Sequence, residues 1–229
     1  MGKQLQLTSP DGHEFDVYEV EPDGVAKGTI VIIQEIFGVN AHIREVAEGY
    51  AKAGYRALAP ALFDRVERHV SLGYSGADMM AGVELARGKL KREDALVDLQ
   101  TTLSAAGDRG ASVGVVGYCF GGLMAYLTAC ELDGLSAAVS YYGGGVSGEM
   151  HRSPKVPVMF HFASEDAHIS LDDVDVVKNA LPNAPVQIYA ADHGFNCNHR
   201  ASYDEAAAVD ALAKTLEFFQ QHVDLAERA

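Results

Sequence analysis

The residues with the clearest chemical potential lie in a short glycine-rich segment near the middle of the 229-residue chain. Residues 117–122 read Gly-Tyr-Cys-Phe-Gly-Gly and join an apolar stretch to a helical pattern. This G-x-C-x-G arrangement between a strand and a helix is typical of a nucleophile elbow, whose apex side chain points out of the sheet. The start of a helix beside Cys119 also favours the thiolate, which is the reactive form. The alternative is a small buried cysteine, which is the role we expect for Cys130 in the apolar helix that follows.

A nucleophile elbow requires an acid and then a histidine later in the chain, in loops that follow strands. Asp166 and His193 each follow an apolar run with strand character. We expect His193 to take the thiol proton, and Asp166 to orient the imidazole and stabilise its charged form. Glu165 and Asp192 are the alternatives for the acid, and a surface loop histidine is the alternative for His193.

Strand and helix patterns that position these residues alternate along most of the chain. Two runs of alternating polarity around residues 11–12 predict an opening hairpin. Apolar runs separated by helical patterns then predict a mostly parallel sheet with helices on both faces and functional groups at the strands' carboxyl ends. The predicted strands cover residues 4–8, 14–20, 28–34, 55–59, 111–116, 137–142, 156–162 and 186–190. The predicted helices cover residues 41–53, parts of 76–106, 120–131, 171–180 and 202–222. Because no repeat or linker interrupts this α/β pattern, we expect one domain over residues 1–229.

A second motif gives the sequence a family resemblance. Residues 34–38 read Gln-Glu-Ile-Phe-Gly directly after the early strand, and residues 193–195 read His-Gly-Phe. With the cysteine elbow and Asp166, these motifs make the chain similar to the dienelactone hydrolase family of the α/β-hydrolase superfamily. The resemblance extends from the first hairpin to the last helix.

The resemblance implies a fold and a set of site residues. The fold is the α/β-hydrolase fold, and the implied triad is Cys119, His193 and Asp166. The resemblance also implies that Glu35 helps to generate the thiolate; from the residues alone, a surface loop carboxylate is an equal alternative for Glu35. The implied oxyanion hole consists of two backbone N–H groups, which belong to Ile36 and Phe120.

The substrate-binding residues depart from the family pattern. Family members that open dienelactones hold the substrate carboxylate with arginines, one of them four residues after the catalytic histidine. Cys197 occupies that position here, and Arg200 lies three residues further on. We expect Cys197 to make the pocket mouth less polar, which suits a neutral ester, and we assign no role to His168. Candidates for substrate contact are Phe37, Tyr142 (with a core position as its alternative) and Arg200. A second arginine would come from the middle region, which offers Arg65, Arg68 and Arg87.

Composition excludes several classes of function. The chain has 32 acidic and 18 basic residues, a net charge of −14, and so acidic a surface repels nucleic acid and anionic membranes. Three cysteines indicate a reducing compartment with no disulfide framework. Residues 1–10 lack the apolar core of a signal peptide, and no apolar run approaches the roughly 20 residues that span a bilayer. We expect a soluble cytoplasmic protein, either a monomer or a small homo-oligomer.

The remaining question is whether the site uses a metal or a cofactor. His193, Cys197 and His199 have metal-like spacing, but no second ligand cluster accompanies them. We therefore expect neither a metal nor an organic cofactor. The function we expect is hydrolysis of small carboxylic esters or lactones through an acyl-thioester on Cys119. The alternatives are a non-catalytic ligand-binding protein on a hydrolase scaffold and a thiol redox protein.

Overall fold

The structure, a computed structural model, describes residues 2–224 and contains an eight-stranded sheet in the order β1-β2-β4-β3-β5-β6-β7-β8. β1 and β2 form the predicted antiparallel hairpin, β2 is also antiparallel to β4, and every other pair in this sheet is parallel. The strands are β1 (Lys3–Thr8), β2 (Glu14–Val20), β3 (Thr29–Ile33), β4 (Arg56–Pro60), β5 (Val113–Tyr118), β6 (Ala137–Tyr141), β7 (Val158–Ala163) and β8 (Val186–Tyr189). The prediction of a mostly parallel sheet is confirmed.

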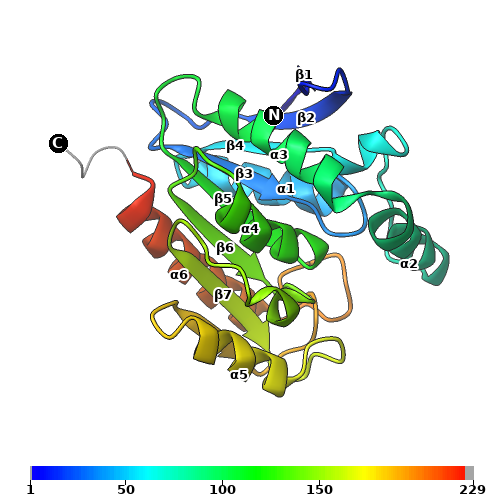
Figure 1. Ribbon diagram of the computed structural model, residues 1–229, viewed down its shortest axis with the longest axis vertical. Coiled ribbons are helices and arrows are strands. Elements are labelled where there is room, and N and C mark those ends of the chain that lie inside the picture. The colour runs from blue at the N-terminus through cyan, green and yellow to red at the C-terminus, as the bar shows by residue number, and fades with distance from the viewer. Residues whose placement is uncertain (1, 225–229) are drawn as a thin grey trace.

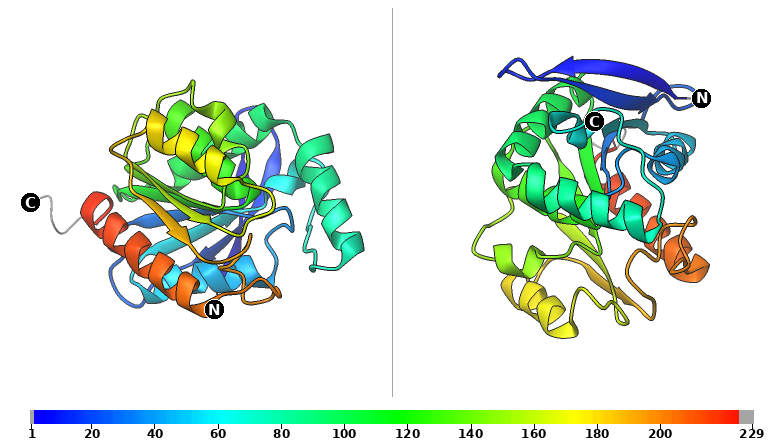
Figure 2. Two further views of the ribbon diagram at one scale, coloured as in Figure 1. Left: turned by 90° about the horizontal axis from the view of Figure 1, so that it is seen from below. Right: turned by 90° about the vertical axis from the view of Figure 1, so that its right-hand side faces the viewer.

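Helices cover both faces of this sheet (Figures 1 and 2). α1 (Ala41–Lys52) and α6 (Glu205–His222) pack on one face, and α3 (Arg92–Ala106), α4 (Phe120–Glu131) and α5 (Leu171–Ala180) lie on the other. The core lies between these layers, where β3, β4, β5, β6 and β7 consist entirely of buried residues. Burial on both faces explains why these strands read as continuous apolar runs.

Shorter elements connect these layers at the carboxyl edge of the sheet. α2 (Gly76–Val83) projects from the body of the molecule in Figure 1 and continues into a π-helical segment, η2 (Glu84–Lys89). Two 3₁₀ turns, η1 (Leu62–Arg65) and η3 (Val146–Glu149), follow β4 and β6. Among the described residues, no helix combines the length and apolar character needed to cross a bilayer.

Several element boundaries differ from the prediction by one to three residues, and two of these differences have identifiable reasons. β5 continues to Tyr118, because residues 117–118 still pair with β6 in register. The strand therefore ends immediately before Cys119. α6 begins at Glu205 instead of residue 202, because the Asp204 side chain accepts a hydrogen bond from the Ala207 N–H and caps the helix.

Candidate active site

Cys119 lies at the sharp turn between β5 and α4. Its backbone has φ 56° and ψ −113°, a conformation that L-residues rarely adopt. The Cys119 N–H donates to the Tyr141 carbonyl at 3.0 Å, and the Cys119 carbonyl accepts from the Gly122 N–H at 2.9 Å. The residue is partly exposed. This hydrogen-bonded turn therefore holds the thiol at the carboxyl end of the sheet, within reach of solvent.

The glycines of the motif are required by backbone contacts. A Cβ on Gly117 would lie 1.8 Å from the carbonyl oxygen of Gly121, and a Cβ on Gly121 would lie 2.2 Å from that of Ile33. Any side chain at either position would force strand and helix apart. The second contact also fixes the elbow against the end of β3, the strand that leads to Glu35.

Replacing Gly117 by alanine is expected to lower the free energy of unfolding by about 3 kcal/mol or more, because the added Cβ overlaps backbone that cannot rotate away. Urea denaturation followed by circular dichroism measures the change. Gly144→Ala is the matched control, since no described atom lies within 4 Å of a Cβ built there. Equal stabilities of the two variants would contradict the required close approach.

His193 links Cys119 to Asp166. Its Nε2 lies 3.1 Å from the Cys119 Sγ, and its Nδ1 lies 2.7 Å from the Asp166 Oδ2. The Asp166 Oδ1 accepts the backbone N–H groups of His168 at 2.7 Å and Ile169 at 3.2 Å. Both carboxylate oxygens are thus engaged, and the imidazole is held with Nε2 directed at the sulfur.

The neighbouring acids have other positions. Asp166 follows β7 and His193 follows β8, so the parallel sheet brings their two loops together. Glu165 is exposed. Asp192 is also exposed, and its carboxylate accepts the backbone N–H of His193 at 2.6 Å. Of these three acids, Asp166 is the one that hydrogen-bonds to the imidazole.

The His193 imidazole is strongly biased toward its protonated form. Burial by itself lowers its pKa, but hydrogen bonds to Asp166 and Cys119 and the charges of both partners raise the pKa to about 10. At neutral pH the ring is therefore an imidazolium. A protonated ring and a thiolate on Cys119, with the Nε2 and Sγ atoms 3.1 Å apart, would stabilise each other.

Glu35 is a buried carboxyl next to this pair. It follows β3, is 1% exposed, and neither of its oxygens forms a hydrogen bond to a described residue. Burial raises its pKa, and the positive charges of Arg200 and His193 offset only part of that effect. The raised pKa favours a neutral carboxyl, which does not repel a nearby thiolate. The sequence-based alternative of a surface loop carboxylate is wrong, because the loop after β3 turns into the protein.

Arg200 reaches the site from the loop between β8 and α6. Its Nη1 lies 3.8 Å from the Glu35 Oε1, and its guanidinium lies 5.9 Å from the ring centroids of both Phe37 and Tyr74. This position depends on Gly194, where φ is +80° and a Cβ would lie 2.4 Å from the Arg200 Nη1. The structure thus brings Arg200 to the site although it is seven residues from His193.

In a comparison with models of known protein families, residues 15–223 match the model of the dienelactone hydrolase family. The chain belongs to the dienelactone hydrolase family. Membership places it among the hydrolases, and it confirms the resemblance drawn from the cysteine elbow and the Gln-Glu-Ile-Phe-Gly motif.

Individual relatives extend over nearly the same length. A Synechocystis protein named "Putative carboxymethylenebutenolidase" is 36% identical over 89% of this chain and 90% of its own. The carboxymethylenebutenolidase of Pseudomonas putida is 29% identical over 93% of this chain and 94% of its own. A Klebsiella pneumoniae crystal structure described as a "Putative Dienelactone Hydrolase" superposes with a TM-score of 0.82 at 28% identity, covering 97% of this chain and 99% of its own. These likenesses identify the eight-stranded fold as the α/β-hydrolase fold.

The candidate substrate contacts Tyr142 and Phe37 occupy different parts of the site. Tyr142 is fully buried, with its ring 5.1 Å from that of His193 and edge-on to Phe195. The Tyr142 ring therefore packs against the His193 imidazole from the buried side and helps to hold it in place. Phe37 is 1% exposed and packs edge-on against Tyr74 at 4.6 Å. Both side chains are aromatic packing around the polar groups of the site.

The arginines of the middle region do not gather at this site. Arg65 forms two hydrogen bonds of 2.8 Å to Asp98. Arg68 donates to the backbone carbonyl of Glu14 in the opening hairpin. Arg87 is exposed in η2. Arg200 is thus the candidate arginine that the structure places beside Glu35.

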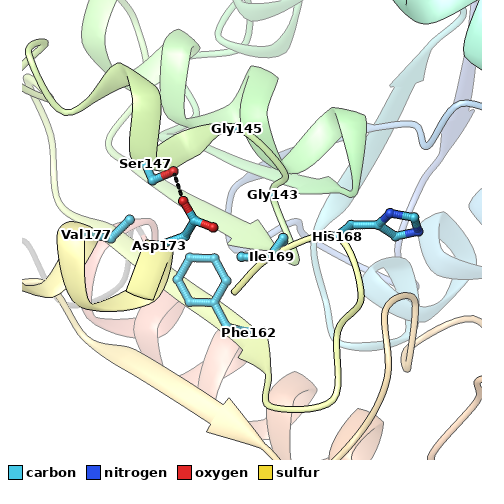
Figure 3. A pocket seen from close by; sticks show the side chains of 8 residues that line it. All are labelled: Gly143, Gly145, Ser147, Phe162, His168, Ile169, Asp173 and Val177. Carbon is cyan, nitrogen blue, oxygen red and sulfur yellow. Dashed lines mark hydrogen bonds between the residues drawn. The ribbon is translucent and has the colours of Figure 1, made fainter. Parts of the chain in front are cut away.

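His168 marks the border between the triad and a neighbouring pocket. Its ring packs edge-on against that of His193 at 5.1 Å. The pocket beside it has a volume of about 220 Å³ and is closed on one side by a hydrogen bond from Ser147 to Asp173. In Figure 3 the His168 ring turns away from the other labelled side chains of this pocket. His168 therefore lines one end of the pocket and also packs against the imidazole of His193.

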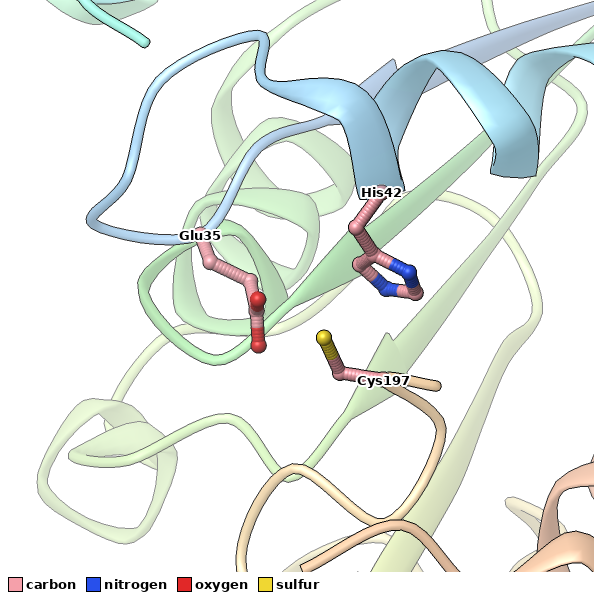
Figure 4. Close-up of side chains that lie close together, drawn as sticks. All are labelled: Glu35, His42 and Cys197. Carbon is pink, nitrogen blue, oxygen red and sulfur yellow. The ribbon is translucent and has the colours of Figure 1, made fainter. Parts of the chain in front are cut away.

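One expectation about the segment after His193, the place of Cys197 at the pocket mouth, is corrected. Cys197 is fully buried and donates to the Tyr74 hydroxyl at 3.2 Å, so it does not line the pocket mouth. His193, Cys197 and His199 do not converge, because the His199 Nε2 lies 2.9 Å from Glu45 and His193 faces Cys119. Cys197 instead lies close to two other side chains, Glu35 and His42 (Figure 4).

Two residues of the site, Tyr74 and His42, were not predicted from the sequence. Tyr74 contacts both Cys197 and Arg200 from the segment just before α2. His42 lies on the buried side of the first turn of α1. Neither belongs to a motif with a recognisable spacing. For His42, the one available signal is its place three residues from the Glu45 that binds the loop after β8.

Proposed function

We propose that the chain hydrolyses carboxylic esters or lactones through a covalent acyl-thioester on Cys119. The observation that carries the proposal is the single imidazole that bridges Cys119 and Asp166 at 3.1 and 2.7 Å. This is the arrangement of a nucleophile, its base and an orienting acid. Family membership and the named relatives support the same reaction class.

In the proposed first step the Cys119 thiolate attacks the ester carbonyl and forms a C–S bond. The negative charge on the carbonyl oxygen is stabilised by the backbone N–H groups of Phe120 and Ile36. Phe120 is the first residue of α4, so its N–H has no acceptor within the helix. The tetrahedral species then collapses, and the imidazolium of His193 gives its proton to the departing alkoxide.

In the second step neutral His193 takes a proton from water, and the resulting hydroxide attacks the thioester. The carbonyl–sulfur bond breaks, which releases the carboxylic acid and regenerates the thiolate paired with the imidazolium. Glu35 contributes through its charge state. As a neutral carboxyl it does not oppose the thiolate. If substrate entry leaves Glu35 ionised beside a neutral Cys119 thiol, its carboxylate accepts the thiol proton and becomes that neutral carboxyl.

Arg200 is the proposed anchor for a carboxylate on the substrate. A guanidinium can hold a carboxylate through two parallel hydrogen bonds, and Arg200 already lies between two aromatic rings and an acidic neighbour. An anionic substrate would take the place of Glu35 as its partner. Phe37 and Tyr142 stay predicted substrate contacts. In the structure both are buried, with Tyr142 packed against the His193 ring and Phe37 against Tyr74.

The test is a comparison of p-nitrophenyl esters with dienelactone as substrates of the full chain. We expect Arg200→Ala to lower kcat/KM for dienelactone by about 10- to 100-fold, because a charge-assisted hydrogen bond contributes roughly 1.5–3 kcal/mol. Neutral aryl esters should change much less. Arg87→Ala, at an exposed arginine in η2, is the control. An equal loss on neutral and anionic substrates would contradict a carboxylate-binding role, and no turnover of any ester would contradict the hydrolase.

A further inference from the structure

Three potential metal ligands meet beside the triad from three separate segments. Glu35 follows β3, His42 lies in the first turn of α1, and Cys197 lies in the loop before α6. A carboxylate oxygen, an imidazole nitrogen and the sulfur all lie within 4.8 Å of one another (Figure 4). The three residues are 1%, 2% and 0% exposed. We call these three residues the Glu35 cluster.

The Glu35 cluster contains buried polar atoms whose hydrogen-bonding capacity is unused. Neither oxygen of Glu35 nor the Nε2 of His42 forms a hydrogen bond to any described residue. Leaving such atoms buried and unpaired is costly, so an arrangement that holds three of them together calls for a ligand. A cation coordinated by these atoms would satisfy all of them at once.

The tautomer of His42 suits coordination. Its Nδ1 lies 3.2 Å from the Asn198 Oδ1, and the Asn198 amide nitrogen donates to Glu45 at 3.1 Å. The amide is therefore oriented with its carbonyl oxygen toward His42, so the proton lies on Nδ1. Nε2 then carries a lone pair directed into the cluster. A metal-binding histidine is oriented in the same way, by a hydrogen bond from its second ring nitrogen.

We propose that Glu35, His42 and Cys197 form a binding site for Zn²⁺, and that the bound ion inhibits the hydrolase by sequestering Glu35. One thiolate, one imidazole and one carboxylate are ligands that Zn²⁺ accepts readily. Two negative ligands also neutralise the double charge of the ion, which suits a buried site. The fourth tetrahedral position is left to water.

The site needs only small adjustments to close around the ion. Zn²⁺ bonds of roughly 2.0–2.3 Å require ligand atoms somewhat closer together than 4.8 Å, which side-chain rotations can supply. The Cys197 thiol and the neutral Glu35 carboxyl each lose a proton to solvent on binding. Its present hydrogen bond to Tyr74 then reverses, and the Tyr74 hydroxyl donates to the thiolate. Tyr74 would so stabilise the charged ligand.

Arg200 competes with the ion for Glu35. Its guanidinium lies 3.8 Å from the Glu35 carboxylate, and its side chain is 16% exposed and rests on aromatic rings. It can swing outward when Zn²⁺ takes its place. Replacing Arg200 by alanine removes this competing charge, so Arg200→Ala should bind Zn²⁺ more tightly than the wild-type chain.

The first experiment measures binding without reference to catalysis. Isothermal titration of the full chain with Zn²⁺ should show one equivalent, and Co²⁺ should give a thiolate-to-metal charge-transfer band. Cys197→Ser and His42→Gln, checked for folding by circular dichroism, should each weaken binding by about 100-fold. Cys130→Ser is the matched control and should bind normally. Unchanged affinity in Cys197→Ser would overturn the proposal.

The nucleophile could itself bind thiophilic metals, so a second arm separates the two sites. Cys119→Ser should still bind one equivalent of Zn²⁺ and should still give the thiolate-to-metal charge-transfer band with Co²⁺. Their loss in that variant would place the metal on the triad and overturn the Glu35 cluster as the site.

The proposed inhibition rests on the proposed function, and it is measured separately, as the effect of Zn²⁺ on the rate of ester hydrolysis. Zn²⁺ should slow aryl-ester hydrolysis by the wild-type chain, a chelator should restore it, and Cys197→Ser should resist inhibition relative to its own metal-free rate. Equal inhibition of both would overturn the inhibitory role. Absence of ester hydrolysis in metal-free wild type would instead refute the proposed function and leave the binding result standing.

Discussion

Cys119→Ala is expected to reduce kcat for aryl-ester hydrolysis by roughly 10⁴-fold or more, because no other thiol is placed against His193. Cys130 lies eleven residues further on in α4, and Cys197 is buried against Tyr74. The substitution removes one sulfur from a partly exposed position. Its fold should therefore remain intact by circular dichroism and thermal unfolding, and a p-nitrophenyl acetate assay measures the loss.

Two further variants sharpen this result. Cys119→Ser keeps a hydroxyl at the elbow, but the site stabilises a thiolate through an imidazolium and is poorly suited to ionise an alcohol. Its activity should lie far below wild type. Cys130→Ala is the control and should retain full activity. Full activity in Cys119→Ala would refute the acyl-thioester mechanism.

Asp166→Asn is expected to lower kcat/KM by about 10³- to 10⁴-fold, comparable to the loss of the orienting acid in other triads. The Asp166 Oδ1 accepts two backbone N–H groups, so an asparagine would keep its carbonyl oxygen there. Its amide N–H₂ would then face the His193 Nδ1 and move the ring proton to Nε2. An imidazole protonated only at Nε2 cannot accept the thiol proton.

The pH profile distinguishes this effect from a general loss of structure. The hydrogen bond to Asp166 helps to raise the His193 pKa to about 10, so its removal must lower that pKa. The imidazolium–thiolate pair would then break at lower pH, and the alkaline limb of kcat/KM should shift toward neutrality. Glu165→Gln and Asp192→Asn are the matched controls. A profile that shifts equally in either control would assign the orienting role to that residue instead.

Much of the fold could be predicted from local patterns. β3 and α4 lie within one residue of their predicted limits. A strand that is buried on both faces reads as a continuous apolar run, and a helix gives apolar residues a period of 3.6. The Gly-x-Cys-x-Gly segment could likewise be interpreted locally. Its glycines are required because so sharp a turn between a strand and a helix brings backbone atoms too close for a Cβ.

The choice of partners around the sulfur required tertiary structure. The sequence pattern predicted Asp166 as the acid and left Glu165 and Asp192 as alternatives, and the path of two loops brings Asp166 to the imidazole. The same holds for the fully buried position of Cys197.

Local sequence patterns predict the order of the elements. They also predict the proposed thiol nucleophile and the proposed acid and histidine that follow it along the chain, since each leaves a periodic or short-range signature. Two other features follow from the three-dimensional fold: Arg200 lies 3.8 Å from Glu35, and Glu35 lies close to His42 and Cys197. These residues are separated along the chain by up to 165 positions, counted from Glu35 to Arg200. Their contacts depend on where irregular loops end after β3 and β8, and loop paths are set by packing across the whole molecule, not by local residue preferences.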